Sequence, residues 1–327
     1  MIEFSQILTA NEKFLSVIKV AKKISTSDIS VLITGENGTG KNLLAMAIHD
    51  NSTRKSGPFV SVNCSAIPES LLESELFGHD KGAFTGAYAK RKGKFELAHK
   101  GTLFLDEIGD MNLSAQAKIL QAIETKQFIR VGGEEVVNVD VRVVSATNQN
   151  LIEKVETNSF RMDLYYRIRE ITMEIPPLRE RKEDIPILLE SFIKQFSTDF
   201  GKKIKGISNV ALNFLVNHDW KGNVRELRNV VRTAVALCEK DMIWLEDIPL
   251  RLELGNEKSS TEKILTMESF SLNDMEKTHI LRTLQHCRWN KSKAARLLQI
   301  SRPRLNRKIL EYDLKKPDKK NNPRHMS

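Results

Sequence analysis

The pattern of hydrophobic and polar positions divides the chain into a first part with strands and helices and later parts that are helical. The runs VLIT (31–34), LFL (103–105) and VRVVSA (141–146) are short and almost wholly apolar or β-branched, which is typical of strands in a parallel sheet. Helical spacing follows the first run in NLLAMAIHD (42–50). We therefore expect a doubly wound α/β domain over residues 1–177.

A charged segment bounded by prolines, PPLRERKEDIP (176–186), ends this pattern. Apolar spacing in 185–196, 210–216 and 224–238 predicts the helices of a second subdomain over 178–250. Residues 251–269 are mostly polar and are interpreted as a linker. Helical spacing resumes at Leu272, so we expect an all-α domain over 270–315 and a basic, disordered tail over 316–327.

The segment NKSKAARLLQISRPRLNRKILEYDL (290–314) predicts a short helix, a turn at 299–301 and a second helix, which is helix-turn-helix geometry. Ser301 is suited to cap the second helix, and proline is tolerated in its first turn. Leu305, Ile309 and Tyr312 share one face and should pack inward. The residues left to meet a DNA major groove and its phosphates are Arg302, Arg304, Asn306, Arg307 and Lys308. The alternative is a basic helical hairpin that binds nothing.

Composition and charge limit the possible functions. The chain has 327 residues, of which 40% are hydrophobic, enough for two or three compact units. It contains no apolar run of membrane-spanning length and no signal-peptide start, so we expect a cytoplasmic protein. Its three cysteines are far apart, which indicates neither a disulfide framework nor a zinc site. Residues 288–327 hold 13 Lys and Arg but three acids, a basic module typical of nucleic-acid binding or of a solubilising tail.

A glycine-rich segment, GENGTGK (35–41), lies between the first strand and the first helix of the α/β part, which is the P-loop order. Its glycines would let backbone N–H groups surround a phosphate while Lys41 reaches the β and γ oxygens. An ordinary glycine-rich turn is the alternative. The next residue is Asn42, where P-loops usually have a serine or threonine for Mg²⁺. The predicted ATP-binding residues here are Gly35, Glu36, Asn37, Gly38, Thr39, Gly40, Lys41 and Asn42.

Acidic and polar residues follow two of the other predicted strands. Asp106 and Glu107 end the apolar run 103–105, at the sheet edge where ligands bind. Asp106 is suited to hold Mg²⁺ through water, and Glu107 to orient or deprotonate the water that attacks the γ-phosphate. Thr147 and Asn148 end the strand from Val141 and could sense the γ-phosphate. Two solvated acids in a loop are the alternative interpretation.

Six motifs together carry a family resemblance. They are GENGTGK, ELFGHDKGAFTGA (75–87), GTLFLDEIGDM (101–111), FIRVGG (128–133), FRMDLYYRI (160–168) and GNVRELRN (222–229). Because the motifs occur in this order, residues 5–250 resemble the central AAA+ ATPase domain of the sigma-54-dependent transcription activators, also called bacterial enhancer-binding proteins. The N-x-x-K-A-A-x-x-L pattern of 290–298 resembles the Fis-type DNA-binding domain that ends most of these activators.

The resemblance implies roles for further residues. GAFTGA is the loop that contacts sigma-54 in the family, which corresponds here to Gly82, Ala83, Phe84, Thr85, Gly86 and Ala87, with FIRVGG as a second loop beside it. Arg161 and Arg167 match arginine fingers that reach the γ-phosphate of a neighbouring subunit, so the resemblance implies a ring, expected to be a hexamer. Asn63 matches the switch residue that pairs with Glu107, and Arg225 the sensor arginine of the lid. The rival interpretation of Phe84 is a core residue.

The chain departs from the family pattern at several positions. Asn42 stands where an acidic residue is usual, Lys221 where proline is usual, and Lys100 and Gln299 where glycine is common. About thirty residues precede the P-loop strand, too few for a receiver domain, so we expect control by a partner acting in trans unless the chain is a piece of a longer protein.

We therefore predict a transcription activator that binds upstream DNA and uses ATP and Mg²⁺ to remodel the sigma-54 RNA polymerase closed complex. A DNA-binding regulator with a silent ATPase, motivated by Asn42, is the first alternative. A general AAA+ remodelling enzyme with no promoter role is the second.

Overall fold

The computed structural model describes residues 2–84, 86–249, 276–277, 280–281, 283–284, 287, 289–298, 300–312 and 314. The expected linker (251–269) and tail (316–327), together with Thr85 and Gln299, lie outside the described residues. The chain divides into two compact units, Met1–Glu253 and Leu254–Ser327, which we describe separately. Within the described ranges, no helix has the length and apolar character needed to cross a membrane.

A parallel five-stranded sheet forms the centre of the first unit. Its strands are β1 (Val31–Thr34), β2 (Phe59–Asn63), β5 (Thr102–Asp106), β8 (Arg142–Thr147) and β9 (Ile171–Glu174), in the order β2-β5-β8-β1-β9. In the register, Thr34 pairs with Thr147 and Glu174, and Asn63 pairs with Asp106. The carboxyl ends of all five strands therefore meet at one edge, as the sequence predicts for an α/β sheet.

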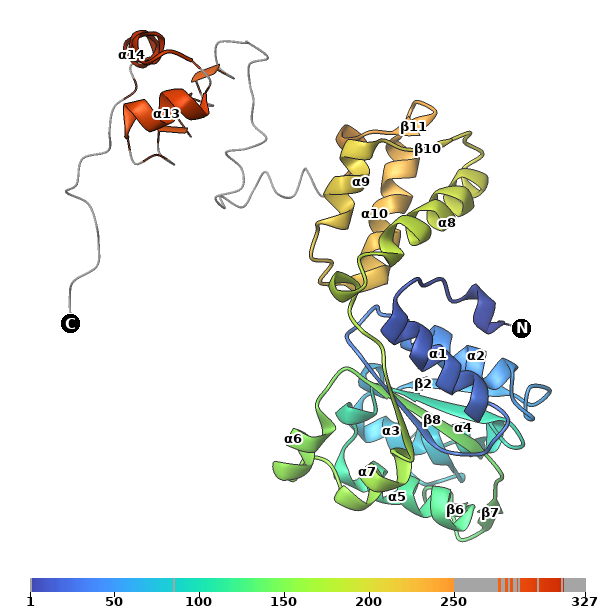
Figure 1. Cartoon of the computed structure of the whole chain (residues 1–327). Coiled ribbons are helices and arrows are strands. Elements are labelled where there is room, and N and C mark those ends of the chain that lie inside the picture. Colours follow the sequence, from blue (N-terminus) through green and yellow to red (C-terminus); the bar gives the residue numbers. More distant parts are fainter. Residues whose placement is uncertain are drawn as a thin grey trace, which may run out of the picture. The chain divides into compact units, whose positions relative to one another are not determined.

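Helices cover both faces of this sheet because alternate strand residues point to opposite sides (Figure 1). Leu32, Leu103 and Leu105 belong to one core, and Val31, Ile33 and Phe104 belong to the other. The helices of the first core are α3 (Glu69–Phe77), α4 (Lys94–Leu97), α5 (Leu113–Thr125), α6 (Leu151–Glu156) and α7 (Met162–Ile168); those of the second are α1 (Glu12–Ile24) and α2 (Lys41–Asp50).

Two small hairpins project from the α/β part. The first pairs β3 (Gly78–His79) with β4 (Arg91–Lys92), and the second pairs β6 (Gln127–Ile129) with β7 (Val136–Asn138). GAFTGA connects the strands of the first hairpin, and the end of FIRVGG follows β6 in the second. A bridge between His79 and Val131 joins the two hairpins, so the two motifs lie side by side.

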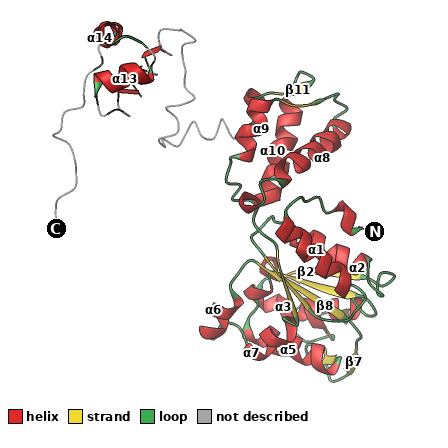
Figure 2. Cartoon of the chain, in the orientation of Figure 1, coloured by secondary structure: helices red, strands yellow, loops and turns green. Residues whose placement is uncertain are grey.

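The predicted helical subdomain forms a lid with its own core. It contains α8 (Asp184–Asp199), α9 (Asn209–Val216) and α10 (Asn223–Leu237), with a short parallel pair of β10 (Gly206–Ile207) and β11 (Met242–Ile243). Figure 2 shows how helices dominate this part, in contrast to the strands of the α/β part. The core packs around Trp220, which is fully buried and donates from its indole N–H to the Leu215 carbonyl at 2.8 Å.

The described part of the second unit contains α13 (Lys291–Leu297) and α14 (Arg302–Glu311). Ser301 caps α14 by accepting a hydrogen bond from the Arg304 N–H, and proline lies in the first turn, as predicted. Leu305 and Ile309 are buried in a small core that Tyr312 also contacts. The expected α/β domain, its helical lid and the two helices expected of a helix-turn-helix are thus confirmed.

Candidate functional site

The P-loop curves tightly between β1 and α2 and lies against the lid. Gly35, Gly38 and Gly40 all have positive φ angles. At Gly38 glycine is also required by space, because a Cβ atom there would lie 2.3 Å from the carbonyl oxygen of Gly222 in the lid. The Val224 N–H donates to the Gly38 carbonyl at 3.0 Å. The start of α10 therefore rests directly on the phosphate-binding loop.

Lys41 is buried and turned back over the P-loop. Its Nζ donates to the Gly35 carbonyl at 2.9 Å and lies 3.2 Å from Oε1 of Glu107. Because α2 begins at this lysine, the same segment supplies helix N-terminal N–H groups and one positive charge. This combination is suited to binding the phosphates of a nucleotide.

Asp106 and Glu107 differ in their surroundings although they are adjacent. Burial raises the pKa of the Asp106 carboxyl above its ordinary value, and the neighbouring Glu107 charge raises it further. The Oδ1 atom of Asp106 is buried and makes no hydrogen bond within the described protein. A buried carboxylate oxygen with a free lone pair fits a hydrated Mg²⁺ ion, because such ions prefer oxygen ligands and keep several waters.

Glu107 adopts a left-handed backbone conformation with φ of 53°, an unfavourable state for a residue other than glycine. Its carboxylate accepts from the Asn148 N–H at 3.1 Å with one oxygen and contacts Lys41 with the other. The strained turn therefore directs the side chain toward the P-loop. Asn148, at the end of β8, meets Glu107 through its backbone.

Lys41, Asp106 and Glu107 line one cavity of about 290 Å³, whereas Asn148 lines a different one. Asn42 is exposed at its edge, and Arg225 contributes from the lid, as expected for the sensor position. Arg228, which the sequence analysis did not single out, lines it too; it follows Arg225 by three residues, a spacing that places both on one helix face. The complete lining is Asn37, Gly38, Gly40, Lys41, Asn42, Leu43, Asp106, Glu107, Val224, Arg225 and Arg228.

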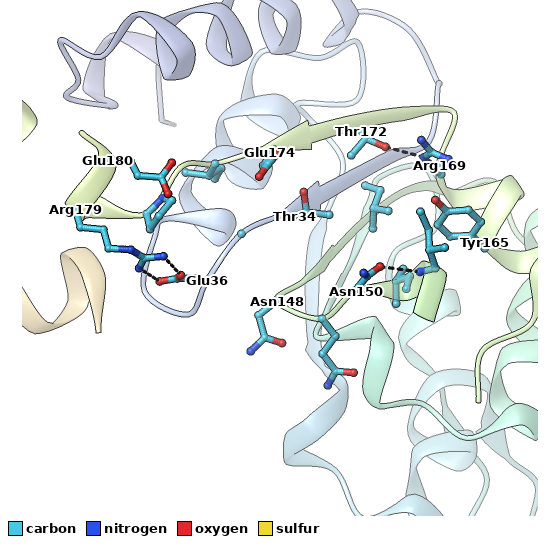
Figure 3. Close-up of a pocket in the computed structure, with 17 residues that line it drawn as sticks. Thr34, Glu36, Asn148, Asn150, Tyr165, Arg169, Thr172, Glu174, Arg179 and Glu180 are labelled. Carbon is cyan, nitrogen blue, oxygen red and sulfur yellow. Dashed lines mark hydrogen bonds and ion pairs between the residues drawn. The ribbon is translucent and has the colours of Figure 1, made fainter. Parts of the chain in front are cut away.

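A second, larger cavity of about 620 Å³ lies beside Gly35 and Glu36 (Figure 3). Arg179 forms a two-pronged ion pair with Glu36 at its border, with N–O distances of 2.6 and 2.8 Å. This pair holds the pKa of the Glu36 carboxyl below its ordinary value, and a hydrogen bond from Asn223 lowers it further. No local pattern in the sequence marks Arg179 or Asn223, because their partner lies more than 140 residues away.

Asn63 and the two predicted arginine fingers are held by their own neighbours. The Asn63 side chain accepts from the N–H groups of Ser65 and Ala66, and among the described contacts none joins it to Glu107. Arg161 pairs with Asp163 at 2.6 Å, and Arg167 pairs with Glu170 at 2.9 Å. Neither arginine lines the cavity around Lys41.

The GAFTGA loop leaves its aromatic side chain at the surface. Phe84 is 40% exposed, and its ring packs edge-on against the His79 ring with centroids 5.0 Å apart. Gly82 and Gly86 have φ angles of 87° and 108°, which only glycine adopts without strain. The core interpretation of Phe84 is therefore not supported. Thr85 lies outside the described residues.

The FIRVGG segment contacts this loop directly, which agrees with its expected place beside it. Asp80 donates from its N–H to the Val131 carbonyl at 3.1 Å. A Cβ atom on Gly132 would lie 2.6 Å from the Cβ of Ala83, so only glycine permits this approach. The two loops are therefore in direct contact.

The helix-turn-helix unit exposes most but not all of the predicted DNA-binding residues. Arg302, Arg304 and Arg307 are exposed on α14, and Asn306 is half-buried. Lys308 differs from the expectation, because its side chain is 14% exposed and its Nζ lies 2.9 Å from Glu276. The aliphatic stem of a lysine can pack along an apolar face while its ammonium group reaches a nearby carboxylate. We therefore assign Lys308 to the internal packing of this unit.

Comparisons with known proteins match all three parts of the chain. Residues 7–174 match the Sigma-54 interaction domain, 179–264 the AAA+ ATPase lid domain, and 271–312 the family described as bacterial regulatory protein, Fis family.

Individual relatives give the same result. Regulatory protein AtoC of Escherichia coli is 42% identical over 320 residues, covering 97% of this chain and 69% of its own. The DNA-binding transcriptional regulator NtrC of Proteus hauseri is 41% identical, covering 91% and 68%. A crystal structure of NtrX from Brucella abortus in complex with ATP is similar with a TM-score of 0.69 at 31% identity, covering 94% of this chain and 69% of that one. The chain therefore belongs to the family of sigma-54-dependent transcriptional activators, with an AAA+ ATPase domain and a Fis-type DNA-binding domain.

Proposed function

We propose that this activator binds upstream DNA, assembles as a ring and uses ATP hydrolysis to remodel the sigma-54 RNA polymerase closed complex. The observation that carries the proposal is that Lys41, Asp106 and Glu107 converge on one cavity while Phe84 is presented on a separate, exposed loop of the same unit. The proposed phosphate site and the proposed protein-contact surface thus belong to one compact body.

In the hydrolytic step, Lys41 would bind the β and γ phosphate oxygens, and Glu107 would orient or deprotonate the attacking water. The 3.2 Å contact between these two side chains implies an exchange of partners, because a phosphate that binds Lys41 competes with the Glu107 carboxylate. Glu107 is then free to turn toward the water or toward Asn63. Arg225, which lines this cavity from the lid, and Asn148, whose backbone contacts Glu107, would respond to the γ-phosphate.

The metal expected with ATP would be held by Asp106, through water, since its buried Oδ1 has a free lone pair. Mg²⁺ bound there would neutralise charge on the phosphate oxygens. Asn42 offers an amide at the position where P-loops usually supply a hydroxyl. We therefore expect weaker metal binding than in relatives with an acidic or hydroxyl residue there.

Ring assembly is supported by the position of Arg161. It lies on an open surface with Met162 and Tyr166, which are 57% and 60% exposed, and outside the cavity of its own P-loop. An exposed arginine with apolar neighbours fits a contact with a second copy of the chain. In a ring, Arg161 and Arg167 would reach a neighbour's γ-phosphate, and a hexamer is the expected size.

Promoter melting tests the proposal. Open-complex formation on a sigma-54 promoter with ATP and Mg²⁺ is compared for the intact chain and for Phe84→Ala, Glu107→Gln and Phe200→Ala. Phe200, in the lid, is 41% exposed and so matches Phe84 in type and exposure. We expect melting by the intact chain and by Phe200→Ala, hydrolysis without melting by Phe84→Ala, and neither activity in Glu107→Gln.

Two other results would favour the alternatives. If the intact chain binds DNA but neither hydrolyses ATP nor melts the promoter, it is a DNA-binding regulator with a silent ATPase, and Asn42 is the residue to restore. If it hydrolyses ATP but does not melt the promoter, it is a general AAA+ remodelling enzyme with no promoter role. Equal melting by Phe84→Ala and the intact chain would instead show that the loop is not the sigma-54 contact.

A further inference from the structure

Asn223 combines complete burial with a strained backbone at the point where the lid meets the P-loop. It is the first residue of α10, it is 0% exposed, and its φ angle is +54°. Asparagine tolerates this left-handed conformation better than most residues, but it still costs energy. Such a conformation persists where the surroundings require it, and it often marks a functional position.

Both ends of the Asn223 amide are used, and they connect different parts of the chain. Its Oδ1 accepts from the Leu178 N–H at 2.7 Å, within the lid. Its Nδ2 donates to the Asn37 carbonyl and to Oε2 of Glu36, each at 3.0 Å, both in the P-loop. One side chain therefore fixes the lid and the phosphate-binding loop relative to each other.

The P-loop end of this connection is secured a second time. Glu36 also receives the two guanidinium hydrogen bonds of Arg179, which comes from the segment that enters the lid. Figure 3 shows this pair from the side of the larger cavity. Asn223, Glu36 and Arg179 together form what we call the lid–P-loop contact. Charge-assisted hydrogen bonds of this kind are stronger than neutral ones.

The lid–P-loop contact stands next to groups that face the phosphate cavity. Val224 and Arg225 follow Asn223 directly on α10 and line that cavity, as does Asn37. Since Asn223 fixes the first turn of α10, it also fixes where the Arg225 side chain begins. If Asn223 served only the internal packing of the lid, the Leu178 bond would be sufficient; the two bonds to the P-loop go beyond that need.

We propose that Asn223 is a positioning residue that holds the P-loop in its phosphate-binding conformation and aligns Arg225 with it. The inference rests on the proposed binding of adenine nucleotide, and it adds that nucleotide affinity depends on the Asn223 amide. With the amide present, the loop is ordered before the nucleotide arrives. Without it, the free energy needed to order the loop reduces the free energy gained when the nucleotide binds.

The test is ADP affinity, measured by calorimetry on the full chain with Mg²⁺ and well below the melting temperature. Asn223→Gly keeps the positive φ angle accessible and removes only the amide. Loss of its hydrogen bonds, one of them to a charged group, should weaken ADP binding roughly tenfold or more. Asn158→Gly is the matched control, because Asn158 has a φ angle of 54° and is exposed away from the site. The ADP affinity of this variant should equal that of the intact chain.

A reversed pair separates positioning from a general loss of structure. Asn223→Asp places two acids together and should weaken ADP binding further than Asn223→Gly. Combining Asn223→Asp with Glu36→Gln restores a pair of one carboxylate and one amide. The donor is then at position 36 and the acceptor at position 223. The loss of ADP-binding free energy in the double variant should therefore be smaller than the sum of the losses in the two single variants.

The outcomes are distinct. Unchanged or tighter ADP binding by Asn223→Gly, or strict additivity in the double variant, would overturn the positioning role and leave the proposed function intact. ADP binding that follows the expected pattern without any ATP hydrolysis would support the positioning role and overturn the proposed activity. If the intact chain binds no ADP, both fail.

Discussion

Asp184 offers the sharpest test of how the first unit is held together. It is the first residue of α8, it is fully buried, and it binds a segment that precedes it by more than 170 residues. Its Oδ1 accepts from the N–H groups of Ala10 and Asn11 at 2.6 and 3.2 Å, and its Oδ2 accepts from the Thr9 hydroxyl at 2.8 Å. Removing it should separate the N-terminal segment from the lid.

The magnitude follows from what would be left behind. Arg181 lies 3.6 Å from Asp184 and is 2% exposed, so Asp184→Ala leaves a buried cation without its acid. Breaking a buried ion pair by removing one partner typically costs about 3–5 kcal/mol. Arg181 keeps its bond to the Thr39 carbonyl at 2.8 Å and its position over the Phe14 ring, which favours the lower half of this range.

Calorimetry of the full chain measures the effect. For a unit of this size each kcal/mol corresponds to a Tm change of about 2–4 °C, so a loss of about 3–4 kcal/mol in Asp184→Ala should lower the Tm by roughly 6–16 °C. Asp184→Asn, which keeps an acceptor for the two N–H groups, should lose less. The control is Asp199→Ala at the exposed end of the same helix, expected within about 0.5 kcal/mol of the parent.

If Asp184→Ala melted within about 2 °C of the parent, the buried contacts of Asp184 would contribute little to stability, since a change of that size corresponds to an ordinary surface substitution. Equal losses in Asp184→Ala and Asp184→Asn would show that the charge, and not the hydrogen bonds to the N-terminal segment, carries the stabilisation.

Three further predictions concern single side chains. Burial raises the pKa of the Asp106 carboxyl, so its ionised form destabilises the fold increasingly as the pH rises through that pKa. Asp106→Asn should therefore raise the Tm of the nucleotide-free chain at neutral pH, and calorimetry should show this gain shrinking in acid. Lys100 has a φ angle of 59°, so Lys100→Gly should stabilise the chain by about 1 kcal/mol in urea unfolding; no gain would mean that the conformation carries little strain. Arg307→Ala should reduce the slope of log K for DNA binding against log salt concentration by about one. Lys308→Met should leave that slope unchanged and lower the Tm of its unit.

Much of the fold and part of the site could be predicted because their signals are local. The strand, loop and helix around Lys41 follow each other in 20 residues, and the apolar run before Asp106 is sufficient to place it at a sheet edge. The capping role of Ser301 likewise depends on residues within one turn. In each case the deciding interactions lie within a few positions of the chain.

Periodicity and short motifs report local conformation, so they were sufficient for the order of elements, the family, and Lys41, Asp106 and Glu107 in the cavity. They did not indicate Arg228, and they did not show that Arg161 and Arg167 lie outside this cavity. Only the tertiary structure decided which distant groups meet. It brought Asn223 and Arg179 to Glu36, turned Lys308 inward to Glu276, and placed Phe84 against His79 at the surface. These contacts depend on how separate elements pack, and a pattern of polar and apolar residues does not specify which polar partner a side chain finds.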